Sequence, residues 1–176
     1  MQANVNIDFS KIDWDSISED KAEFLYKEAL EYHKGIIENN NRINDKALGM
    51  LSFTMPIMTA LAGYFAITWG TASQPLLFAA ICACVCLFVI VFNLLLILIP
   101  RGINQGAGSP SAYFTNEYYK RDMRKLYIGN ITNLHNCILQ DRKVMNKRAL
   151  NFRIAVTFYA ILPVTSFLAF LLGLLC

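Results

Sequence analysis

The sequence predicts an all-α integral membrane protein with three transmembrane helices and cytoplasmic amphipathic helices, assembled as an oligomer. Residues 47–100 and 154–176 contain no Lys, Arg, Asp or Glu, so all 16 basic and 13 acidic residues lie in 1–46 and 101–153. The mean hydropathy is +0.37 and only 16% of the residues are charged. This composition excludes an ordinary soluble domain and a disordered chain.

The first segment, 1–46, is predicted to be an acidic arm followed by an amphipathic helix. Ser16 and Glu19 have the spacing of a capping box, which predicts that the helix begins there. Apolar residues then recur every three, four or seven positions, and this stripe requires a partner helix. The stripe consists of Leu25, Ala29, Tyr32, Ile36, Ile43 and Ala47.

Residues 47–100 are predicted to form a transmembrane hairpin with spans at 47–69 and 76–99. Each span exceeds the roughly 20 apolar residues that a helix needs to cross a bilayer. A buried hairpin of a soluble protein is the alternative, and the length and the absence of charge argue against it. We expect polar and small side chains of the spans to line a pore or pack helices. These are Thr54, Thr59, Ala66 and Asn93, with Ala169 in the third span.

Residues 101–153 are predicted to be a loop followed by a basic helix over 116–150, which leads into the third span at 154–176. Ten basic and three acidic residues give this segment a net charge of +7, against −4 for residues 1–46. Its apolar stripe contains Met123, Tyr127, Leu134, Ile138 and Met145. Opposite charge favours pairing of the acidic and basic helices, within one chain or between subunits.

The loop charges predict the topology. All 16 Lys and Arg lie in the two segments on one side of the spans, which is the positive-inside pattern. We therefore expect a multi-pass protein with its N-terminus and residues 101–153 in the cytoplasm and its C-terminus outside.

Basic and aromatic residues alternate at the start of the basic helix. Guanidinium and ammonium groups hold phosphates and aromatic rings stack on bases, so this segment suits an anionic nucleotide or oligonucleotide. A topology or anionic-lipid determinant and packing against a partner helix are competing interpretations. The candidate ligand residues are Tyr118, Tyr119, Lys120, Arg121, Arg124, Lys125 and Tyr127.

No residue pattern indicates catalysis. Cys82, Cys84 and Cys86 alternate within a span, and alternate residues on a helix point about 200° apart, so they cannot converge on one metal ion. We find no phosphate-binding loop, nucleophile elbow or paired carboxylates. The sequence therefore predicts no catalytic residue, no metal and no cofactor, and a protein that is not an enzyme.

Two short runs carry a resemblance. Glu19–Leu25 (EDKAEFL) and Asn39–Leu48 (NNNRINDKAL), which leads directly into the span hairpin, resemble the small membrane effectors of bacterial anti-phage systems. These include SLATT-type proteins, the membrane effectors of CBASS and Pycsar systems, and the Hailong effector. The resemblance implies an oligomeric channel of the bacterial inner membrane that responds to a nucleotide signal on infection, with the nucleotide made by a partner nucleotidyltransferase.

These observations together predict a homo-oligomeric ion channel or pore gated by an anionic nucleotide bound to the basic helix. The alternative is a non-conducting membrane anchor whose cytoplasmic helices recruit a soluble partner. In the first case, ligand phosphates would neutralise the repulsion between copies of the +7 segment.

Overall fold

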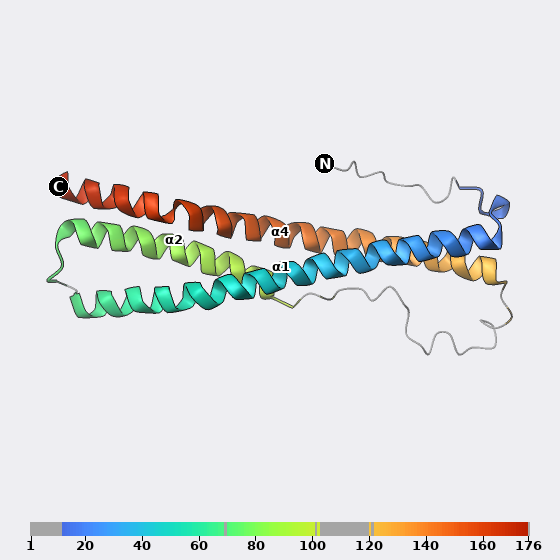
Figure 1. The fold of residues 1–176 in the computed structure, drawn as a ribbon, viewed down its shortest axis with the longest axis horizontal. Helices are drawn as coiled ribbons and strands as arrows, with labels where there is room; N and C mark the ends of the chain where they lie inside the picture. Colours follow the sequence, from blue (N-terminus) through green and yellow to red (C-terminus); the bar gives the residue numbers. More distant parts are fainter. Residues whose placement is uncertain (1–11, 69, 101, 103–119, 121, 176) are drawn as a thin grey trace. The chain divides into compact units, whose positions relative to one another are not determined.

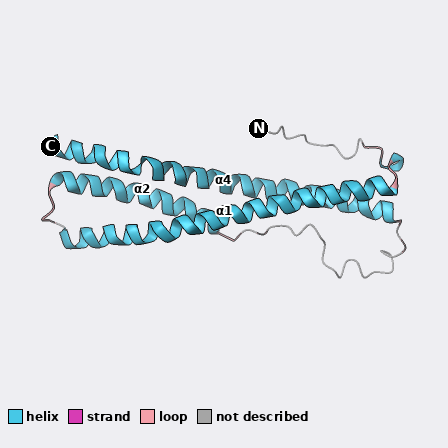
Figure 2. Cartoon of the chain, viewed as in Figure 1, coloured by secondary structure: helices cyan, strands magenta, loops and turns pink. Residues whose placement is uncertain are grey.

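The computed structural model describes residues 12–68, 70–100, 102, 120 and 122–175, and its regular elements are all helical (Figure 2). A short 3-10 helix, η2 (Trp14–Ser16), precedes three long helices: α1 (Glu19–Thr68), α2 (Gln74–Leu98) and α4 (Met123–Leu175) (Figure 1). Each long helix is long and apolar enough to cross a membrane. The predicted all-α fold with three spans is confirmed.

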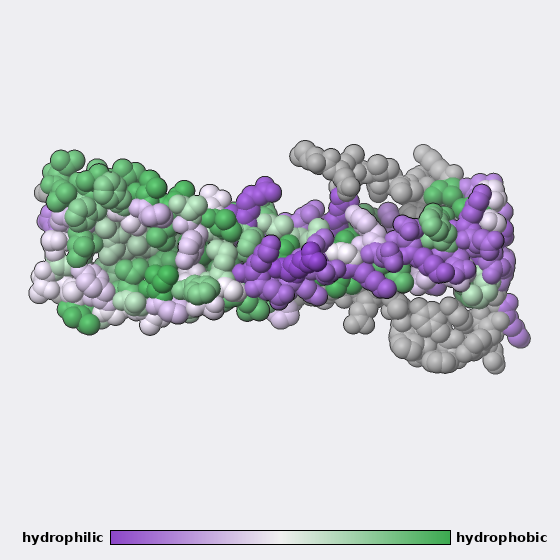
Figure 3. All heavy atoms as spheres, viewed as in Figure 1, coloured by the Kyte–Doolittle hydropathy of each residue, from purple (hydrophilic) through white to green (hydrophobic). Residues whose placement is uncertain are grey.

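The chain divides into two compact units. The polar unit consists of Met1–Glu38 and Gly102–Lys143, and the span unit consists of Asn39–Arg101 and Val144–Cys176. Helices α1 and α4 each contribute to both units, whereas α2 belongs to the span unit alone. On the face drawn in Figure 3, hydrophobic side chains cover the span portions of the helices and hydrophilic side chains cover the polar unit.

A buried apolar cluster holds the three helices of the span unit together. Its members are Ala47, Leu87, Ile90, Leu94, Ile97 and Ala155. Ala47 is the first residue of one charge-free stretch and Ala155 is the second residue of the other. The side chain of Arg148, six residues before the second charge-free stretch, contacts Asn40 on α1 and the carbonyl of Ile99 at the end of α2, so the three predicted membrane boundaries lie near one level.

The connection between α1 and α2 depends on glycine. Gly70 has a φ of 90°, a left-handed conformation that glycine adopts without strain. The carbonyl of Thr68 accepts hydrogen bonds from the N–H groups of Thr71 and Ala72, both at 3.0 Å. On α4, a Cβ placed on Gly173 would lie 2.5 Å from the Cα of Pro75, so only glycine lets α4 approach the start of α2 this closely.

In the polar unit, α1 and α4 pack against each other within one chain. The rings of Tyr26 and Tyr127 lie 5.8 Å apart, and His33 contacts Asp141 at 2.8 Å. The sequence left open whether the acidic and basic helices pair within a chain or between subunits. The structure shows the pairing within one chain.

The first amphipathic helix begins later than expected. The hydroxyl of Ser16 donates to the carbonyl of Asp13 at 2.8 Å and closes η2, so the prediction that Ser16 caps α1 is wrong. The predicted start of the basic helix at 116 lies outside the described residues. Helix α4 begins at Met123, where the carboxylate of Asp122 accepts the N–H of Arg124 at 3.3 Å as an N-cap. Lys120 consequently lies in a turn before the helix.

Candidate functional site

The structure describes only part of the predicted ligand segment. Lys120 and Lys125 are exposed, and Arg124 and Tyr127 are half-buried. The other three predicted ligand residues lie outside the described residues, and they are Tyr118, Tyr119 and Arg121. The assignment of this segment to a ligand stays a prediction.

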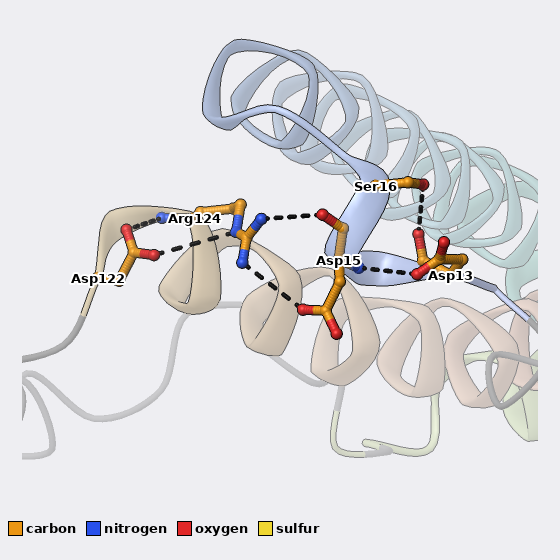
Figure 4. A network of polar contacts seen from close by, with 5 residues as sticks. All are labelled: Asp13, Asp15, Ser16, Asp122 and Arg124. Carbon is orange, nitrogen blue, oxygen red and sulfur yellow. Dashed lines mark hydrogen bonds and ion pairs between the residues drawn. The ribbon is translucent and has the colours of Figure 1, made fainter.

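Acidic groups surround the guanidinium of Arg124 (Figure 4). Its Nη1 donates to the carbonyl of Asp15 at 3.1 Å, and its Nη2 lies 3.6 Å from the Asp15 carboxylate. Its Nε lies 3.9 Å from the carboxylate of Asp122. The Asp15 side chain is 95% exposed, and ion pairs as exposed as this contribute little stability. The Asp15 carboxylate can therefore be displaced from Arg124 at low cost, whereas the contact with the Asp15 carbonyl involves the backbone.

Tyr127 packs against Tyr26, with their rings inclined at 39°. This contact supports a packing role for Tyr127, which is one of the alternatives that the sequence left open.

On α1, the hydrogen bond and the charge of Glu23 raise the pKa of Lys27 above its usual value. Lys27 thus remains cationic at physiological pH.

Two buried polar pairs join residues that the sequence did not indicate as functional. In the polar unit, Nε2 of His33 and Oδ2 of Asp141 lie 2.8 Å apart, with both side chains less than 5% exposed. In the span unit, Nη1 of Arg148 donates to Oδ1 of Asn40 at 2.9 Å. Arg148 is 3% exposed, so this cation is almost completely removed from water.

Both pairs join α1 to α4 at the same sequence offset. The partners are 108 residues apart in each pair, and a constant difference means that the two helices run parallel. His33 and Asn40 are seven residues apart, as are Asp141 and Arg148. Seven residues is the spacing of equivalent positions in a two-stranded coiled coil.

The heptad spacing is the signal that could have revealed these residues. His33 and Asn40 share the three-and-four spacing of Ile36 and Ala47, all of which are buried. The predicted stripe on α1 instead included Leu25 and Tyr32, which are 43% and 48% exposed. The prediction followed apolar side chains alone and therefore deviated from the buried face.

Arg148 also reaches the end of α2. Its Nη2 donates to the carbonyl of Ile99 at 3.1 Å, and Ile99 is the C-cap residue of α2. A cation at a helix C-terminus stabilises the carbonyls that lack partners within the helix. Arg148 therefore connects α1, α2 and α4 at one point.

The polar candidates in the spans form hydrogen bonds within their own helices. Thr54, which is fully buried, donates to the carbonyl of Met50 at 2.7 Å. Thr59 donates to Met55 at 3.0 Å, and Asn93 donates from Nδ2 to Val89 at 2.8 Å. The first two bonds satisfy the hydroxyl donors without a partner helix.

The remaining span candidates differ in exposure within one chain. Asn93 is 9% exposed. Ala66 is exposed and Ala169 is half-buried. Roles in pore lining or helix packing stay predictions for these residues.

Within the described residues, no three His, Cys, Asp or Glu side chains lie close enough to hold a metal ion. The candidates for function are thus the basic residues Lys120, Arg124 and Lys125 and the two buried polar pairs.

The family model of the Pycsar effector protein domain, PycTM, matches residues 28–175, or 148 of the 176 residues. The chain belongs to this family.

As a PycTM protein, the chain is a membrane effector of anti-phage defence, and the resemblance found in the sequence is confirmed. The matched region contains the span unit as far as Leu175 and both buried polar pairs. No curated protein and no solved structure matches the chain.

Proposed function

We propose that this PycTM protein is a homo-oligomeric ion channel or pore of the bacterial inner membrane, triggered by a cyclic nucleotide bound at residues 118–127. One observation carries the proposal. Helices α1 and α4 each begin among polar residues and continue unbroken into a span. A ligand bound at the first turns of α4 is thus bound to a helix that also contains a span.

The ligand would act by replacing the carboxylate of Asp15. A phosphate brings a full charge and several acceptor oxygens to Arg124, and such charge-assisted hydrogen bonds are the stronger ones. Lys120 and Lys125 are exposed and can contact the same anion. In an oligomer the bound phosphates would also reduce repulsion between the +7 segments of neighbouring copies.

Channel activity requires assembly, since three spans of one chain cannot enclose a wide aqueous path. Of the 18-residue apolar stretch of α1 that can cross a membrane, only 6% is buried within one chain, and the same is true of α4. Both helices therefore have surface available to lipid or to other copies. We propose cyclic symmetry, which closes such contacts into a ring.

The proposed orientation places the polar unit in the cytoplasm and the C-terminus outside, on the strength of the positive-inside pattern. Cysteine labels at positions 2 and 108 should be shielded from an impermeant reagent in intact cells, and a label at position 72 should react. Labelling of position 108 from outside would contradict this orientation. The cyclic nucleotide would come from a partner nucleotidyltransferase, and we assign no catalytic residue and no cofactor to this chain.

Ion flux from liposomes tests the proposal. The full-length protein is reconstituted and exposed to a panel of 3′,5′-cyclic ribonucleotides, one of which should change the flux. The variant Arg124→Gln/Lys125→Gln should insert and assemble normally but lose this response. The control Lys21→Gln/Lys34→Gln removes the same charge from exposed positions of α1 and should respond as wild type.

Two results would overturn the proposal. An unchanged response in Arg124→Gln/Lys125→Gln would place the ligand elsewhere. Absence of flux with every nucleotide, together with stoichiometric recovery of one soluble protein on the wild-type chain, would support the non-conducting anchor.

A further inference from the structure

A groove in the span unit lies between α1 and α4, with a volume of about 340 Å³. The proposed nucleotide segment belongs to the other unit, the polar unit. Two cationic side chains, one amide and no carboxylate line it. The lining residues are Asn39, Arg42, Ile43, Lys46, Met145 and Ala149.

The depth of the groove relative to the bilayer follows from the residues that come directly after it on α1. Lys46 is the last charged residue before the charge-free stretch, and the next residue, Ala47, packs in the buried apolar cluster with Ile97 and Ala155. A helix rises about 1.5 Å per residue, so Arg42 lies about 6 Å further from the hydrocarbon than Lys46. The polar layer on each side of a bilayer is about 5–7 Å thick. Both cations therefore lie at the level of the lipid headgroups, whichever way the protein faces.

The chemistry of the groove suits a phosphate diester. A guanidinium can hold two phosphate oxygens at once, and an ammonium adds a point charge beside them. The amide of Asn39 supplies two further N–H donors. Ile43, Met145 and Ala149 form an apolar wall that a free phosphate does not need but that the glycerol and first methylene groups of a lipid can cover.

We propose that this groove binds the phosphodiester of an anionic phospholipid headgroup. A cyclic nucleotide carries the same diester, but the headgroup level and the apolar wall favour the lipid. A lipid held between α1 and α4 would make the packing of these two helices depend on the anionic lipid content of the membrane.

Native mass spectrometry of the full-length protein tests this site. Protein is released from neutral detergent micelles doped with phosphatidylglycerol or with phosphatidylcholine, and retained lipid is counted per chain. Wild type should retain phosphatidylglycerol in preference to phosphatidylcholine. Each basic residue near a membrane surface contributes about fivefold in affinity for anionic lipid, so Arg42→Gln/Lys46→Gln should lower the affinity roughly 25-fold.

Two further variants separate charge from folding. Lys21→Gln/Lys34→Gln removes two exposed charges that do not line the groove and that precede it on α1, and it should bind phosphatidylglycerol within about twofold of wild type because surface charge effects are local. Arg42→Lys/Lys46→Arg keeps both charges and should retain the lipid. If this charge-preserving variant loses the lipid as fully as the Gln variant, the cations are not the recognition element and the proposal fails.

The same samples decide between the two sources of phosphate. Equal retention of phosphatidylglycerol and phosphatidylcholine by wild type would overturn the proposal, as would undiminished phosphatidylglycerol binding by Arg42→Gln/Lys46→Gln. The panel of 3′,5′-cyclic ribonucleotides is then added to phosphatidylcholine micelles. Binding to wild type but not to Arg42→Gln/Lys46→Gln would assign the groove to the nucleotide and reject the lipid. If wild type and Arg42→Gln/Lys46→Gln bind the nucleotide equally well, the nucleotide binds outside the groove, and the groove remains assigned to the lipid.

Discussion

The buried cation Arg148 permits a quantitative prediction. Replacing it with Met keeps most of the side-chain length and removes two hydrogen bonds, to Oδ1 of Asn40 and to the carbonyl of Ile99. Hydrogen bonds to a charged group contribute about 1.5–3 kcal/mol each, and an apolar side chain of similar size recovers part of this loss. We expect Arg148→Met to lower the free energy of unfolding by about 2–4 kcal/mol.

Asn40→Leu should also destabilise the protein, because it leaves Nη1 of Arg148 without its Asn40 acceptor while the cation stays buried. The double variant Asn40→Leu/Arg148→Met replaces one polar pair by an apolar pair. Its destabilisation should be smaller than the sum of the single effects by about 1 kcal/mol or more, since residues in contact are coupled.

Reversible unfolding in detergent, followed by far-ultraviolet circular dichroism, measures all three variants. Lys147→Met is the matched control, because Lys147 is the exposed neighbour of Arg148 on the same helix. We expect this control to lie within about 0.5 kcal/mol of wild type. If the Asn40 and Arg148 effects add within about 0.5 kcal/mol, the two side chains are not coupled and the reasoning from their contact is refuted.

Two further predictions follow from single contacts. His33→Leu leaves the buried carboxylate of Asp141 without its imidazole partner and should lower the free energy of unfolding by about 2–4 kcal/mol, which thermal melts at pH 7 in the same detergent can measure. An unchanged melting temperature would contradict this pairing. Gly173→Ala forces α4 away from Pro75 and should cost about 1–3 kcal/mol, whereas Gly63→Ala, with open space around its Cβ, should be neutral or stabilising. Equal effects at both glycines would show that the close approach is unimportant for stability.

The spans were predictable because their signal is additive along the chain. Each residue of a charge-free stretch independently favours the bilayer, so summed hydropathy located the boundaries without knowledge of any partner. The cluster of Ala47, Ile97 and Ala155 agrees with them. Family membership was also accessible, since the short runs near Asn39 already pointed to anti-phage membrane effectors.

The polar pairs were not predictable in this way. A lone His33 or Asn40 on a charged helix is ordinarily a solvated residue, and its burial is favourable only when a partner satisfies it. The partners lie 108 residues away, and only the register of α1 against α4 brings them together. The start of α4 depends on a similar contact, because the side chain of Asp122 caps the helix and this role cannot be distinguished in the sequence from that of one more charge within the helix.

The same register limits how the two helices can move. Helix pairs commonly rearrange by sliding one heptad or one turn, and a slip of one heptad is tolerated where the seam is uniformly apolar. A slip in one direction would place Leu134 opposite His33 and Arg148 opposite Ala47. A slip in the other direction would place Arg148 opposite His33, so in both cases His33 and Arg148 lose their present partners. Losing the partner of a buried charge typically costs about 3–5 kcal/mol. We therefore expect α1 and α4 to keep their register within each unit. The double variant His33→Asn/Asn40→His, which swaps these two residues, should be destabilised in the same unfolding assay although its composition is unchanged.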